Sequence, residues 1–125
     1  MNEKKRFVGI FLLTITITRL LIYFVPRNSF IYADNLHHIF YGIILLGVYF
    51  FIKRKSWSYV LLAIALGLIV DEITQFPFYI SHLLGYSLAS ISFWDYWSSY
   101  SVLSTAVATA FVTYLIWRNM GFRKA

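Results

Sequence analysis

Four long apolar segments divide this chain of 125 residues, and they constrain its fold more than any other feature. They cover approximately residues 7–25, 35–52, 57–76 and 99–117. The length of each segment is close to the ~20 residues that a helix needs to cross a bilayer. The chain is 60% hydrophobic and 13% charged, whereas about a quarter of a soluble domain is charged. The sequence therefore predicts an all-α, polytopic membrane protein, a single domain with four transmembrane helices in an antiparallel bundle.

The basic residues alternate with these segments in a way that predicts the orientation of the chain. Nine of the 11 Lys and Arg residues fall on one side of the threading, namely Lys4, Lys5, Arg6, Lys53, Arg54, Lys55, Arg118, Arg123 and Lys124. Because cytoplasmic loops are enriched in Lys and Arg, we expect both termini and the middle loop in the cytoplasm of a multi-pass cell-membrane protein. These flanking clusters leave no basic face for a nucleic-acid backbone, so the expected partner is the lipid bilayer. The outer connection 77–98 is aromatic and is expected to lie in the interface.

Asp71 and Glu72 are the least expected residues, because they lie inside the third apolar segment. A carboxylate within the membrane costs about 2.5–3.5 kcal/mol on insertion scales. Two adjacent carboxylates also repel each other. The pair therefore predicts a bound cation or a shared proton at this position.

A His-rich turn opens the second segment. Asp34, His37, His38 and Tyr41 are spaced at i, i+3, i+4 and i+7, which places them near one face of a helix. Because the second and third segments are antiparallel, His37 and His38 are expected beside Asp71 and Glu72. Asp34 also fits a helix N-cap, which is the more favoured interpretation of that residue.

Two further charged residues have alternative interpretations. Arg19 is expected at a depth in the membrane similar to that of Asp71. It either forms a buried ion pair, with Asp71 or with Glu72, or it binds an anionic group of a ligand. Asp95, just before the fourth segment, is either a ligand or an N-cap among interfacial aromatic residues. One arginine paired with one carboxylate leaves the other carboxylate unexplained.

A metal site follows as the favoured hypothesis. The chain has no Cys, so a metal would take imidazole nitrogen and carboxylate oxygen, which suits a divalent ion such as Zn, Mn or Fe. The predicted ligands are His37, His38, Asp71, Glu72 and Asp95. Glu72 and Arg19 are the candidate catalytic residues, acting on a lipid or headgroup at the outer leaflet in a metal-dependent hydrolysis. The alternatives are a component of ion or proton transport and a structural membrane subunit with a buried salt-bridge network.

These motifs resemble those of a known group of proteins. His37-His38-x-x-x-Gly42, Gly67-x-x-x-Asp71-Glu72 and Asp95-Tyr96-Trp97-Ser98 are similar to motifs of small, uncharacterised prokaryotic integral membrane proteins with four helices. In that group a His-His motif opens one membrane helix and an Asp-Glu motif closes the next. The resemblance implies that these positions form one site, and it implies no activity.

Small residues predict where helices approach closely. Gly42 leaves room for a neighbouring helix or a ligand, and Ala63 with Gly67 stand one helical turn apart. A stripe of small residues in the fourth segment has the same spacing, comprising Ser101, Ser104, Thr105, Ala108 and Thr109. We expect both sets to serve helix packing.

Overall fold

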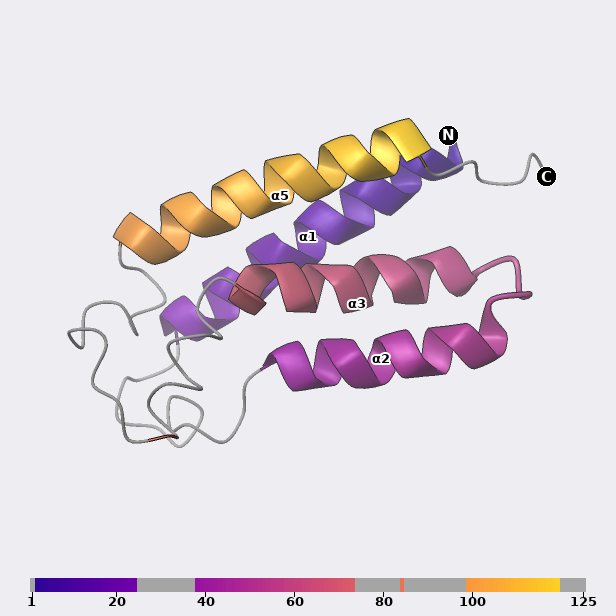
Figure 1. The fold of residues 1–125 in the computed structure, drawn as a ribbon, viewed down its shortest axis with the longest axis horizontal. Helices are drawn as coiled ribbons and strands as arrows, with labels where there is room; N and C mark the ends of the chain where they lie inside the picture. The colour runs from indigo at the N-terminus through magenta and orange to yellow at the C-terminus, as the bar shows by residue number, and fades with distance from the viewer. Residues whose placement is uncertain (1, 25–37, 74–83, 85–98, 120–125) are drawn as a thin grey trace.

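The computed structural model describes residues 2–24, 38–73, 84 and 99–119 (Figure 1). Over these residues the chain forms four helices and no strand: α1 (Glu3–Phe24), α2 (His38–Ile52), α3 (Ser58–Ile73) and α5 (Ser99–Asn119). The prediction of an all-α chain with four helices is therefore confirmed. The ends predicted for the second helix (35–37) and for the third (74–76) lie outside the described residues, as does the connection 77–98 apart from Leu84.

The first helix begins earlier than expected, at Glu3 rather than near residue 7. The Asn2 side chain accepts a hydrogen bond from the Lys4 backbone N–H at 3.1 Å, and the Asn2 carbonyl accepts one from Arg6 at 3.1 Å. Asn is a favoured N-cap, and Lys and Arg have good helix propensity. The basic cluster was expected to precede the helix, and it forms the first turn instead.

The helices are arranged with α3 in the centre, packed against α1, α2 and α5. A tight turn at 53–57 joins α2 to α3, closed by a 2.8 Å hydrogen bond from the Lys55 N–H to the Ile52 carbonyl. This turn, the start of α1 and the end of α5 lie at one end of the molecule in Figure 1. Of the nine basic residues assigned to the cytoplasmic side, those that the structure describes all lie at this end.

The core joins α1, α3 and α5. Its buried members are Phe7, Phe11, Ile15, Leu62, Ala63, Val70 and Ile116. Both α2 and α5 keep large apolar side chains on their outer faces. Phe51 of α2 is 91% exposed and Leu103 of α5 is 68% exposed.

One described helix is long and apolar enough to cross a membrane, over Ser101–Asn119 of α5. Only 17% of this apolar stretch is buried inside the protein, whereas the core helix of a water-soluble domain is mostly buried. The helix α2 is also apolar but shorter, at 15 residues. In α1, four charged residues occupy the first turn, Glu3, Lys4, Lys5 and Arg6, and the rest of the helix carries one charged residue, Arg19.

Two glycines mark close helix contacts, as the small-residue pattern predicts. A Cβ atom at Gly42 of α2 would lie 2.8 Å from the Ala65 carbonyl oxygen of α3. A Cβ atom at Gly67 of α3 would lie 2.8 Å from Cβ of Thr14 in α1. A neighbouring helix therefore fills the space beside each glycine.

A matched pair of substitutions in α2 tests this packing. We expect Gly42→Ala to destabilise the protein by about 1–3 kcal/mol, because the added methyl group meets backbone that must move. Gly47→Ala introduces the same methyl group where no atom lies within 4 Å. This control should be neutral or stabilising by up to about 1 kcal/mol, from helix propensity. Unfolding in detergent micelles measures both, and equal effects would contradict the close contact.

Candidate functional site

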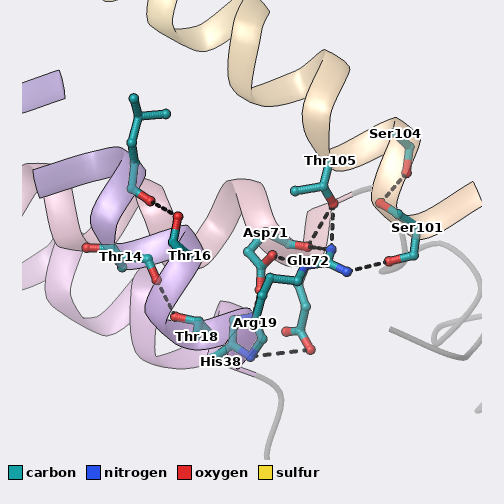
Figure 2. Close-up of polar contacts among 11 residues, drawn as sticks. Thr14, Thr16, Thr18, Arg19, His38, Asp71, Glu72, Ser101, Ser104 and Thr105 are labelled. Atoms are coloured by element: carbon teal, nitrogen blue, oxygen red, sulfur yellow. Dashed lines mark hydrogen bonds and ion pairs between the residues drawn. The ribbon is translucent and has the colours of Figure 1, made fainter. Parts of the chain in front are cut away.

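A buried polar cluster joins all four helices at the end opposite the α2–α3 turn (Figure 2). Here α1 and α3 end while α2 and α5 begin, so side chains remote in sequence meet. The cluster comprises Arg19 of α1, His38 of α2, Asp71 and Glu72 of α3, and Ser101 and Thr105 of α5. We call these six residues the polar cluster.

Arg19 and Asp71 form its centre. The Arg19 Nε donates to Asp71 Oδ1 at 2.6 Å, and Nη2 donates to the Asp71 backbone carbonyl at 3.2 Å. Arg19 is 7% exposed and Asp71 is fully buried. Arg19 therefore forms a buried ion pair with Asp71, which is one of the two interpretations of this residue. The guanidinium contacts both the side chain and the backbone of Asp71.

The helix α5 completes the surroundings of Arg19. The Arg19 Nη1 donates to the Ser101 hydroxyl at 3.0 Å, and the Arg19 Nη2 donates to the Thr105 hydroxyl at 2.7 Å. Both Ser101 and Thr105 are buried. Thr105 also donates to the Asp71 carbonyl at 3.3 Å. Sequence reasoning assigned these two residues to helix packing only. Their i, i+4 spacing opposite an arginine at the same depth was the available signal for a polar role.

His38 lies on the other side of Asp71. Its Nε2 is 2.7 Å from Asp71 Oδ2, and its Nδ1 is 3.8 Å from Glu72 Oε1. The first distance is a hydrogen bond, and the second is too long to be one. Because a neutral imidazole has one donor nitrogen, donation to Asp71 from Nε2 puts the lone pair on Nδ1, which faces Glu72.

Glu72 also contacts the start of α2. Its Oε2 accepts a hydrogen bond from the Ile39 backbone N–H at 2.9 Å. The first N–H groups of a helix have no partner within the helix, and the N-terminus of the helix dipole favours a negative charge. A carboxylate from α3 therefore caps α2, which helps to explain why Glu72 is 4% exposed in an apolar bundle.

The charges in the polar cluster do not balance while His38 is neutral. The cluster contains the carboxylates of Asp71 and Glu72 and the guanidinium of Arg19, so with both carboxylates ionised its six residues carry one net negative charge. A proton on His38, a bound cation or a basic residue outside the described part of the chain would offset it. A positive charge beside His38 and Glu72 would therefore be favourable.

Of the predicted site residues, the structure brings together Arg19, His38, Asp71 and Glu72. The other two predicted ligands, His37 and Asp95, lie outside the described residues, as does Asp34. Within the described part of the chain, no group of three or more His, Asp or Glu residues has the arrangement of a metal site. A metal there would need a further ligand besides those that the described residues supply.

Comparison with known proteins adds no relative to this description. No protein-family model matches the chain, and neither a curated protein nor a solved structure matches it. The resemblance in the His-His and Asp-Glu motifs therefore stays a prediction, and the functional argument rests on the polar cluster itself.

Proposed function

We propose that this chain is a four-span membrane protein with cytoplasmic termini and that the polar cluster is a cation site in the outer half of its bundle. The exposed apolar faces of α1, α2 and α5 support the membrane placement, because soluble proteins rarely expose contiguous apolar surface of this extent. The basic residues gathered at the opposite end support the orientation. In this placement Arg19, Asp71 and Glu72 lie below the outer interface.

The absence of Cys allows a direct topology test with single cysteines. We expect Ser56→Cys, in the turn between α2 and α3, to react with a membrane-impermeant maleimide only after cells are permeabilised. The matched variant Leu84→Cys, at an exposed position, should react in intact cells. Labelling of Ser56→Cys from outside would reverse the orientation and with it the location of the site.

The observation that carries the site proposal is the position of the His38 ring between two carboxylates. Histidines that bind metals usually donate their second ring N–H to a carboxylate, which fixes the tautomer. Asp71 is at hydrogen-bond distance for that role, and Arg19 holds Asp71. The 3.8 Å between His38 Nδ1 and Glu72 Oε1 is within the span of two metal–ligand bonds of about 2.0–2.1 Å each.

We therefore assign His38 and Glu72 as two ligands of a divalent ion of the Zn, Mn or Fe type. Asp71 and Arg19 orient His38 and are not themselves ligands in this proposal. His37 and Asp95 are the candidates for the remaining ligands. A bound divalent ion supplies Lewis-acid chemistry that activates water, and the substrate class that meets the outer half of a bundle is a lipid or its headgroup.

Metal content tests this assignment. Purified protein in lipid nanodiscs, exposed to Zn²⁺ and then dialysed, should retain about one ion per chain by elemental analysis. Glu72→Gln should lose that ion because an amide replaces the anionic ligand. Glu3→Gln makes the same change at the other end of the bundle and should retain it. Folded wild-type protein that retains no Zn²⁺, Mn²⁺ or Fe²⁺ would exclude the metal site.

A second candidate function is a structural subunit, and one observation favours it. The polar cluster ties all four helices together through side-chain hydrogen bonds, as an internal brace would. In that case His38 carries a proton and forms ion pairs with Asp71 and Glu72. The two candidates differ in the cation beside Glu72, a metal ion in one and a proton on His38 in the other.

A further inference from the structure

A long groove between α1 and α5 lies outside the polar cluster except at one end. Its volume is about 890 Å³, within the range of about 300–1,000 Å³ typical of ligand sites. Its walls are mostly apolar and include Leu12, Ile15, Leu20, Val102, Ala106 and Ala110. From Val102 to Trp117 it follows α5 for about 22 Å at 1.5 Å per residue, which exceeds the about 15 Å of hydrocarbon in one leaflet.

Two cations flank the cytoplasmic end of this groove. The Lys4 Nζ donates to the Trp117 backbone carbonyl at 3.1 Å, and the Arg118 Nη1 donates to the Tyr114 hydroxyl at 3.1 Å. Trp117 and Tyr114 themselves line the groove. An apolar groove with aromatic and basic side chains at one end is complementary to an amphiphile with an acyl chain and an anionic headgroup.

A second copy of the chain is a poorer fit for the same groove. Copies inserted in the same orientation would bring their own Lys4 and Arg118 to the same depth, so like charges would meet at the mouth. A phosphodiester has the opposite sign. Charge complementarity therefore favours a lipid over a second copy.

We propose that the α1–α5 groove binds one acyl chain of an anionic phospholipid from the cytoplasmic leaflet, with its phosphate at Lys4 and Arg118. This inference depends on the membrane placement proposed above and is independent of the cation site. Each cation contributes about fivefold to affinity for an anionic lipid, by the general value of about 1 kcal/mol per residue.

Native mass spectrometry of the detergent-purified protein with phosphatidylglycerol and phosphatidylcholine tests this proposal. We expect one phosphatidylglycerol to be retained in preference to phosphatidylcholine. Lys4→Ala with Arg118→Ala should weaken retention roughly 25-fold. The control, Lys53→Ala with Lys55→Ala, removes the same charge at the exposed α2–α3 turn and should leave retention unchanged.

A second pair of variants tests the groove itself. Ala110→Phe fills it and should abolish retention, whereas Val107→Phe enlarges an exposed side chain outside the lining. Unchanged helical content confirms that both variants fold. Equal retention of the two lipids, equal effects of the two double variants, or a lipid-free dimer would overturn the proposal. Failure of the membrane placement is distinguishable, because Ser56→Cys would then react in intact cells or Leu84→Cys would not.

Discussion

Replacing Asp71 by Ala is expected to destabilise the protein by about 3–5 kcal/mol, the cost of breaking a buried ion pair from one side. The guanidinium of Arg19 would lose its 2.6 Å contact and stay in a site where it is 7% exposed. His38 would lose its hydrogen bond to Asp71 in the same step. The free energy of unfolding in detergent micelles measures the effect.

The double variant Arg19→Met with Asp71→Leu separates the ion pair from the packing around it. Replacing both charges with apolar side chains of similar size is often neutral or stabilising, so we expect it to recover most of the lost stability. Glu3→Ala serves as the control for loss of a carboxylate and should change stability by less than about 0.5 kcal/mol. A destabilisation by Asp71→Ala that is no larger than that of Glu3→Ala would show that Arg19 does not depend on Asp71.

Asp71→Asn is expected to have the second large effect, which is a weaker affinity of the site for its metal ion. Asn can still accept a hydrogen bond from Arg19 through its oxygen, which turns its NH₂ group toward His38 Nε2. The imidazole would then carry its proton on Nδ1, where the proposal places the metal. Loss of such an orienting partner costs about 10–100-fold in metal affinity.

Zn²⁺ titration of wild type, Asp71→Asn and Glu3→Gln in nanodiscs gives the three dissociation constants. We expect weaker binding for Asp71→Asn alone, with its stability closer to wild type than that of Asp71→Ala. Wild-type affinity in Asp71→Asn would show that Asp71 does not orient the ligand. Complete loss of binding would instead indicate that Asp71 is itself a ligand.

Much of the fold was predictable because hydropathy and charge act over whole segments. Apolar runs predict helices, and the short basic turn at 53–57 makes α2 and α3 antiparallel, which brings His38 beside Asp71. The start of α1 was not predictable in the same way. On a hydropathy scale, a basic cluster marks the end of an apolar run. Lys and Arg nevertheless have good helix propensity, so the helix extends through the cluster.

Details of the polar cluster depend on side-chain geometry that a sequence does not contain. The depth of Arg19 was compatible with an ion pair to Asp71 or Glu72 and with binding of an anionic ligand, and its contact with Asp71 depends on the rotation of the helices. The contact of Glu72 with the Ile39 N–H requires the exact axial offset of α2 and α3. Ser101 and Thr105 were assigned to packing because a small polar residue in a membrane helix serves either purpose.

The protonation state of the His38 ring tests the central claim most directly. Nitrogen-15 NMR of histidine-labelled protein, with His38 assigned through His38→Ala, separates the two ring nitrogens in a chain with three His residues. We predict a large shift of the Nδ1 signal when Zn²⁺ is added, with the Nε2 proton that faces Asp71 retained. A ring protonated on both nitrogens and unaffected by Zn²⁺ would contradict the cation site and leave a structural salt-bridge network.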